Sequence, residues 1–278
     1  MKKLTLLLCF VSFLTKAQNI TVALGKSFTV EKTGSVTMSG NFSNSGAFTL
    51  NSDSDEFSSI IIGGSVSGNI TYNRYVNPVG TNEWDLIGSP VDGLSISAFA
   101  STNSSTLATN GSAYAIGEYN NVTDTWTNYT TSTIGSSGNF DIGKGYQMGS
   151  IGSGSGILVF TGSPASTNQT QSIINNDAAN SGTGRRWNLV ANPFPSYIQG
   201  NANAHATNNF LTVNSDKLDD SYEAIYGYDA DGTGYTIYNN IGTLLLAPGQ
   251  AFMVASDNTN SDNISFTTQM RTVVGGDD

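Results

Sequence analysis

The chain has 278 residues, of which only 12% are charged, and its formal net charge is -10. Soluble domains average about 25% charged residues, so this surface takes its polarity from Ser, Thr, Asn and Gly. With so few Lys and Arg side chains there is no basic footprint for a phosphate backbone, and we expect no nucleic acid partner. One Cys and one His exclude zinc clusters, haem or iron–sulfur ligation and a disulfide framework.

The N-terminus is typical of a secretory signal peptide. Lys2 and Lys3 precede an apolar run over residues 4–14, and small residues at the -3 and -1 positions end at Ala17. The run is too short for a bilayer, which needs roughly 20 residues. We therefore expect cleavage after Ala17 or Gln18, no membrane span, and a secreted or cell-surface protein.

Residues 20–76 alternate with a period of two. In the clearest stretch, Val36, Met38, Phe42 and Leu50 share one side, with small or polar residues between them. Such alternation indicates strands with one buried face. Frequent glycines divide the pattern into short runs, which favours stacked strand-turn rungs in either a small β-solenoid or an all-β sheet layer.

From residue 72 onward the sequence repeats itself. The motif at residues 84–90 (WDLIGSP) returns at 187–193 (WNLVANP), and residues 143–146 (GKGY) return at 249–252 (GQAF). Two further blocks return in the same order: Tyr119, Trp126 and Tyr129 as Tyr228, Tyr235 and Tyr238, and residues 158–161 as residues 264–267. Chance does not preserve such an order, so we infer a tandem duplication.

We therefore predict an all-β fold, with a short N-terminal β-solenoid-like or strand-turn region followed by two tandem homologous β-sandwich/barrel-like units. Helices are expected to be scarce, because residues 216–222 are the only candidate and lack an apolar stripe. The predicted organisation is a signal peptide at 1–17, an N-terminal β region at 18–71, β unit copy 1 at 72–170, β unit copy 2 at 171–275, and a ragged end at 276–278.

The repeated motifs also carry a family resemblance. In chain order they are residues 72–75, 84–90, 143–146, 160–162, 187–195, 247–252 and 266–271. Together they resemble the repeated β-module of secreted and cell-surface proteins of Flavobacterium-type Bacteroidota, many of which are exported by the type IX secretion system. The resemblance covers nearly the whole chain after the signal peptide. It implies an extracellular, mostly β protein and brings no catalytic residue set.

Two segments approach catalytic or nucleotide-binding motifs without completing them. Residues 138–145 resemble a phosphate loop, but Gly145 stands where Ser or Thr would hold magnesium, and the second copy replaces the segment with residues 247–250. A turn leading into a strand explains it better. His205 lies in a loop rich in Asn and Ala, and no G-x-S-x-G elbow is present, so a solvated histidine is favoured. We predict no catalytic residues and no enzyme.

The segment that begins at Asp229 (DADGTG) resembles the start of a calcium loop, in which oxygen ligands surround a hard cation. The last loop position would be Asn240 instead of a bidentate Glu. The flanking aromatic residues favour a β-hairpin that turns here. Asp229 and Asp231 are therefore a weak calcium candidate beside the favoured turn, and no other cofactor is expected.

Aromatic side chains flank both predicted hairpins. They are Tyr119, Trp126 and Tyr129 in the first copy and Tyr226, Tyr228, Tyr235 and Tyr238 in the second. Cross-strand aromatic pairs stabilise a hairpin by roughly 0.2–1 kcal/mol each, which is a sufficient structural reason for them. An exposed aromatic platform near Asn and Asp can also stack on a sugar ring and hydrogen-bond to it. Both interpretations stay open.

Two other sets of residues receive structural interpretations. Trp84 and Trp187 occupy matching places in the two copies, so we expect shared core residues instead of parts of one site. Arg185 and Arg186 are expected to lie in a solvated loop.

The leading hypothesis for function is a non-catalytic secreted or cell-surface β protein that acts as an adhesion, spacer or interaction module. The alternative is a carbohydrate-binding module that uses the aromatic hairpins, and a secreted hydrolase comes third. The expected partners are an extracellular glycan or another surface protein.

Overall fold

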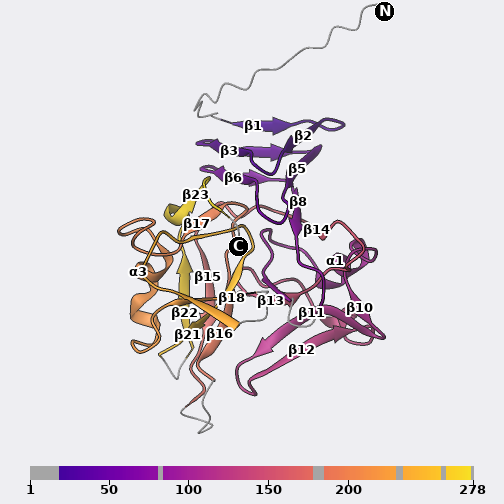
Figure 1. The fold of residues 1–278 in the computed structure, drawn as a ribbon. Coiled ribbons are helices and arrows are strands. Elements are labelled where there is room, and N and C mark those ends of the chain that lie inside the picture. Colours follow the sequence, from indigo (N-terminus) through magenta and orange to yellow (C-terminus); the bar gives the residue numbers. More distant parts are fainter. Residues whose placement is uncertain (1–18, 81–83, 178–184, 230–233, 258–260, 277–278) are drawn as a thin grey trace, which may run out of the picture.

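The computed structural model describes residues 19–80, 84–177, 185–229, 234–257 and 261–276. Within these ranges the fold is all-β, as predicted, and no sheet closes into a barrel. Figure 1 shows a stack of short strands above two larger units that lie side by side. No helix in the described ranges has the length and hydrophobicity that crossing a membrane requires.

The upper stack is a short parallel β-solenoid. Its strands are β1 (Ile20–Val22), β2 (Ser27–Val30), β3 (Ser35–Met38), β4 (Phe42–Asn44), β5 (Ala47–Asn51), β6 (Ser59–Ile62), β7 (Val66–Ser67) and β8 (Ile70–Tyr75). Every third strand stacks in parallel on the same face, giving β1–β4–β7, β2–β5–β8 and β3–β6. Inward residues such as Met38, Phe42 and Phe48 are buried. The alternating pattern therefore forms solenoid rungs and not a flat sheet layer.

The solenoid is joined to both units without a free linker. Strand β8 pairs in parallel with β5 and antiparallel with β14 (Ile157–Gly162), so the expected boundary between residues 71 and 72 falls inside one strand. On β8, the fully buried Arg74 donates through Nε to the carbonyl of Pro248 at 2.9 Å, and its guanidinium lies 4.1 Å from the centre of the Phe57 ring. These contacts fix the solenoid against the second unit as well as the first.

The two units have the same strand order. Besides β14, the first contains β9 (Asp85–Ile87), α1 (Ile96–Thr102), β10 (Thr109–Asn110), β11 (Ala113–Asn120), β12 (Thr125–Thr130), η1 (Ile134–Ser136) and β13 (Tyr146–Met148). The second contains β15 (Gln169–Ile173), β16 (Trp187–Ala191), β17 (Tyr197–Gln199), α3 (Phe210–Asn214), η2 (Ser215–Lys217), β18 (Ile225–Asp229), β19 (Gly234–Tyr238), β20 (Leu245–Leu246), β21 (Ala251–Ala255), β22 (Asp262–Phe266), η3 (Thr268–Met270) and β23 (Arg271–Thr272). The sheet β9–β13–β11–β12 matches β16–β21–β18–β19, and the pair β8–β14 matches β15–β22.

The helices were not foreseen from the sequence. Residues 216–222, a candidate too weak to predict a helix, contain only the end of the single-turn η2, and Leu218 then bridges to Ser256. Helices α1 and α3 occupy matching positions, and each is capped by a side chain, Ser95 and Asn209 respectively. They have seven and five residues, too few to show a helical period.

The units meet through two matching backbone contacts. The N–H of Gly88 donates to the carbonyl of Gly249 at 2.7 Å, and the N–H of Ala191 donates to the carbonyl of Gly143 at 2.8 Å. Gly88 corresponds to Ala191 and Gly143 to Gly249 in the repeated motifs. Each bond is therefore the counterpart of the other with the copies exchanged, which is the pattern of a two-fold contact.

Candidate binding site

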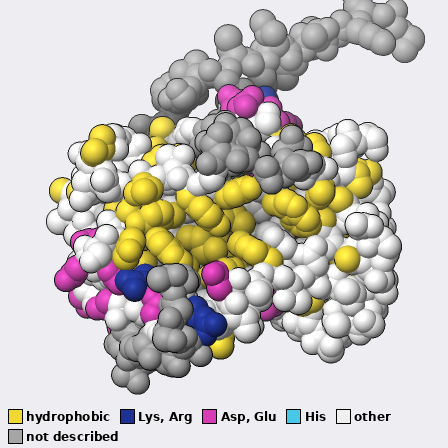
Figure 2. Space-filling view, turned by 60° about the horizontal axis from the view of Figure 1, so that its bottom comes forward, with side chains coloured by type: hydrophobic (Ala, Val, Ile, Leu, Met, Phe, Trp, Pro, Cys, Tyr) yellow, Lys and Arg dark blue, Asp and Glu magenta, His cyan; other side chains and the backbone are white. Residues whose placement is uncertain are grey.

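The two predicted aromatic hairpins converge on one cavity between the repeats. Its volume is about 300 Å³, and its lining residues are Tyr119, Asp124, Trp126, Trp187, Tyr226, Tyr235 and Met253. The first three come from the β11–β12 hairpin and the others from β16, β18, β19 and β21. At the end of the molecule where these strands lie, Figure 2 shows a broad band of hydrophobic side chains. The duplication thus builds one site from both copies.

Strand register explains which aromatic rings meet. Tyr119 stands opposite Trp126 with ring centres 5.2 Å apart, and the matching pair Tyr228 and Tyr235 has ring centres 5.4 Å apart. Side chains alternate along a strand, so Tyr226 projects from the same face of β18 as Tyr228. Tyr226 and Tyr235 line the cavity, while Tyr228 supports Tyr235 from behind the lining.

Besides Tyr228, two more of the predicted aromatic residues, Tyr129 and Tyr238, are not among the cavity's described lining residues. Tyr129 lies on the opposite face of β12 from Trp126, and its hydroxyl donates to Glu118, which also pairs with Lys144 at 3.2 Å. Tyr238 lies on the opposite face of β19 from Tyr235 and packs over Gly227. Both residues are structural in this arrangement.

Trp187 joins the cavity although the sequence analysis assigned it to a shared core. It is half-buried, and its ring centre lies 4.6 Å from that of Tyr226. Both tryptophans pack against buried clusters, Trp84 against the first unit's core and Trp187 against the cluster that contains Leu189 and Met253. Only Trp187 also lines the cavity, and Met253 on the neighbouring β21 completes this wall. Strand pairing could have indicated that Trp187 and Met253 lie near each other. Leu189, two residues after Trp187 on β16, stands opposite Met253 on β21.

Asp124 is the polar residue that the sequence analysis missed. Its carboxylate accepts a hydrogen bond from the hydroxyl of Tyr119 at 2.7 Å. Its φ of 54° is the only positive value of a non-glycine residue in the described ranges. This left-handed conformation is uncommon outside glycine, although Asp and Asn adopt it more readily than other residues. The hairpin turn therefore holds this carboxylate at the cavity rim.

The cavity phenols keep their protons over a wide pH range. Burial and the hydrogen bond to Asp124 raise the pKa of Tyr119 well above its usual range. Burial, followed by the charges of Tyr228 and Asp124, raises the pKa of Tyr235 to about 12. At neutral pH the described lining therefore presents neutral phenols and one carboxylate.

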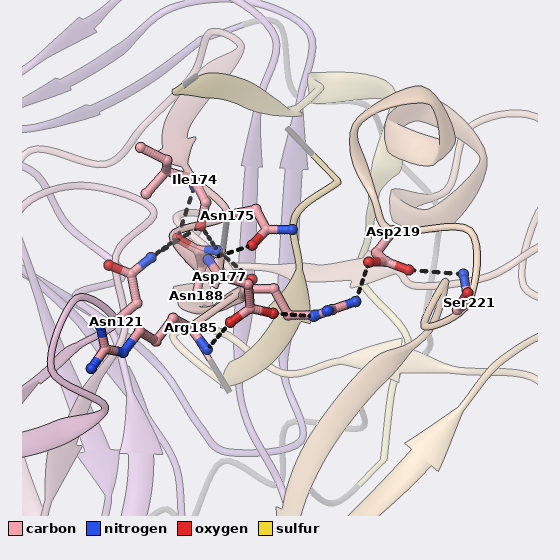
Figure 3. Close-up of polar contacts among 9 residues, drawn as sticks. Asn121, Ile174, Asn175, Asp177, Arg185, Asn188, Asp219 and Ser221 are labelled. Atoms are coloured by element: carbon pink, nitrogen blue, oxygen red, sulfur yellow. Dashed lines mark hydrogen bonds and ion pairs between the residues drawn. The ribbon is translucent and has the colours of Figure 1, made fainter. Parts of the chain in front are cut away.

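A network of asparagines ties the first hairpin to the second unit behind the site (Figure 3). Nδ2 of Asn121, in the β11–β12 turn, donates to the carbonyl of Ile174 at 3.0 Å and to Oδ1 of Asn188 at 3.2 Å. Asn188 in turn accepts from the N–H of Ile174 at 3.1 Å. These bonds hold the hairpin that carries Trp126 against β16, which carries Trp187.

Arg186 is not the solvated loop residue that the sequence analysis expected. Its Nε donates to Asp177 at 2.7 Å and its Nη1 donates to Asp219 at 2.5 Å, and both carboxylates are largely buried (Figure 3). The guanidinium also lies 5.1 Å from the ring centre of Tyr222. Asp177 further accepts from the N–H of Arg185 at 2.8 Å. Both arginines thus bind Asp177 directly before β16, Arg185 through its backbone N–H and Arg186 through its side chain.

The calcium candidate is only partly within the described residues. Asp229 ends β18, with its backbone opposite Gly234, so the chain makes a hairpin here as favoured above. Asp231 lies outside the described residues. In the described ranges no group of three His, Cys, Asp or Glu side chains is placed to hold a metal ion.

The other two motifs adopt the conformations expected of structural segments. Residues 138–145 form a turn leading into β13, and Gly143 has a φ of 83°. Lys144 in this turn pairs with Glu118 and with Asp141, the latter at 3.6 Å. His205 is exposed in a loop, where its Nδ1 accepts from the N–H of Asn208 at 3.0 Å.

Comparison with known proteins gives a family without an assigned activity. No curated protein and no solved structure matches the chain. The family described as "Domain of unknown function (DUF8693)" matches residues 10–277, a span that includes the solenoid and both repeats. The chain therefore belongs to this family of domains of unknown function.

Proposed function

We propose that this chain is a non-catalytic secreted or cell-surface protein that binds a glycan in the cavity between its repeats. The observation that supports this most directly is the convergence of both aromatic hairpins on one cavity. Export is supported by the signal-like N-terminus and by the resemblance to the Flavobacterium-type surface module. Adhesion through a surface glycan would combine the leading hypothesis, an adhesion or interaction module, with its alternative, a carbohydrate-binding module.

The composition of the cavity suits a sugar ring. Ligand sites combine a mainly apolar, aromatic lining with a few polar groups and occupy about 300–1,000 Å³. Here five aromatic rings surround a volume of about 300 Å³. Asp124 and the phenol hydroxyls supply acceptors and donors at its rim. Tyr and Trp offer both a face for stacking and a polar atom for orientation.

The same lining favours binding over hydrolysis. Glycoside hydrolysis uses two carboxyl groups that flank the scissile bond, and the described lining contains one, Asp124. Asp124 is already paired with the hydroxyl of Tyr119. Asp177 and Asp219 are not among the described lining residues, and both are ion-paired with Arg186. We therefore place the secreted hydrolase behind a binding protein.

A glycan array with matched variants tests the proposal. We expect the parent chain to bind at least one glycan class, and Trp126→Ala and Tyr235→Ala to lose that binding. Tyr238→Ala is the control, because Tyr238 lies on the same strand as Tyr235 but faces away from the cavity. No binding by the parent, or equal loss in the control, would contradict the proposal. Turnover of a bound glycan that disappears in Asp124→Asn would replace it with a hydrolase.

A further inference from the structure

We infer that the cavity prefers a glycan with free, protonated amino groups over the same glycan in neutral or anionic form. This inference rests on the proposed glycan binding and names the substrate class. It is carried by the charges and the ring faces around one carboxylate, that of Asp124.

The charge balance of the site is negative. Asp124 is the only charged residue in the described lining. Two basic residues of this region are engaged in ion pairs, Arg186 with Asp177 and Asp219 and Lys144 with Glu118, whereas Arg185 binds Asp177 through its backbone N–H. The whole chain also carries a net charge of -10. A uronic acid or a sulfated sugar would therefore be repelled by the carboxylate of Asp124 in the lining, whereas an ammonium group would be attracted.

The aromatic rings add a second source of preference for a cation. An ammonium within about 6 Å of a Trp or Tyr ring face is attracted by the ring quadrupole, and Trp is the strongest partner. Two Trp and three Tyr rings line this cavity. The sugar ring can then stack on one aromatic residue while its ammonium group faces another.

The β11–β12 turn fixes the position of Asp124, whose left-handed backbone conformation is one that Asp adopts readily in turns. Neighbouring polar contacts stabilise this turn, since Asn120 accepts from the N–H of Val122 at 2.9 Å. The turn holds the carboxylate beside Tyr119, 2.7 Å from its hydroxyl. An amino group of the ligand can share this carboxylate with the phenol.

Calorimetry with a matched pair of ligands tests the inference. The ligands are a chitosan oligosaccharide, whose amines are free, and the fully N-acetylated chitin oligosaccharide of the same length, both at mildly acidic pH. We expect the parent to bind the chitosan oligosaccharide about tenfold more tightly, as one charge pair and one cation–π contact together allow. Asp124→Asn should reduce this preference to less than about threefold, because the amide keeps the shape and removes the charge.

The outcomes separate the inference from the proposed function. Equal binding of both oligosaccharides by the parent, or a preference unchanged in Asp124→Asn, overturns the amino-sugar inference while glycan binding stands. Binding of neither, together with an empty glycan array, overturns the proposed function itself. A lysine oligopeptide of equal charge should bind at least tenfold more weakly than the chitosan oligosaccharide. Equal binding of that peptide would indicate a bare cation site and would also overturn the inference.

Discussion

The duplication predicts that one substitution should have the same effect when made in either repeat. Asn103 directly follows α1, and Asn214 is the last residue of the matching α3; they are 2% and 0% exposed. Nδ2 of Asn103 donates to the carbonyls of Phe99 and Val159 at 2.9 and 3.1 Å, and its Oδ1 accepts from the N–H of Val159 at 2.7 Å. Asn214 makes the same three bonds, to Phe210 at 2.9 Å and to Ser265 at 3.0 and 2.7 Å.

The size of the effect follows from these three bonds. A hydrogen bond contributes about 0.5–1.5 kcal/mol net, and a buried partner left unsatisfied costs more. Replacing either asparagine by alanine leaves one N–H and one carbonyl of a core strand without that partner. We therefore expect Asn103→Ala and Asn214→Ala each to lower the free energy of unfolding by about 3 kcal/mol.

Urea denaturation followed by far-ultraviolet circular dichroism measures both losses. Asn263→Ala is the control, because Asn263 is exposed on β22, two residues from Ser265, and its substitution should change the free energy by less than about 0.5 kcal/mol. A loss below about 1 kcal/mol in either variant, or losses that differ by more than about 2 kcal/mol, would refute the equivalence of the two networks.

Three further substitutions or conditions test other parts of the structure. A Cβ on Gly145 would lie 2.5 Å from Cγ of Leu189 across the contact between the repeats, so Gly145→Ala should destabilise by about 1–3 kcal/mol in urea titration. Gly135→Ala, where the new Cβ meets nothing within 4 Å, should not. The raised pKa of Tyr235 means that the unfolded chain loses this proton first, so the contribution of Tyr235 to stability should be constant below pH 10 and fall as the pH rises toward about 12. A melting temperature that does not change between pH 10 and about 12 would contradict the raised pKa of Tyr235. The Oγ of Ser196 is buried without a hydrogen-bond partner, so Ser196→Ala should leave the melting temperature unchanged or raise it, and a clear decrease would reveal a missing partner.

Much of the fold could be predicted because its information is local or repeated. The period-two run that contains Phe42 and Phe48 predicts strands with one buried face, and the solenoid buries those side chains. The ordered return of four sequence blocks predicts the duplication, and the two sheets share one strand order. Short helices could not be predicted in this way, because the seven residues of α1 are fixed by its Ser95 cap and by tertiary packing of Phe99.

The site was only partly predictable because it depends on how the copies meet. The hairpin aromatics Trp126 and Tyr235 could be predicted from the pattern. Alternation alone did not show which face of each hairpin lies against the other copy. Trp187 was assigned to the core because a matched Trp84 exists, whereas the contact between copies places the two in different surroundings. Asp124 was missed because its importance lies in one hydrogen bond and one dihedral angle, which local sequence does not reveal.

Tryptophan fluorescence during a chitosan oligosaccharide titration tests glycan binding between the repeats most directly. Of the chain's three Trp residues, Trp126 and Trp187 line the cavity, while Trp84 packs against the first core. We predict a saturable change in emission for the parent chain and none for the double variant Trp126→Phe with Trp187→Phe, which reports through Trp84 alone. A parent that binds the oligosaccharide in calorimetry without any change in emission would place the ligand elsewhere and contradict the proposed site.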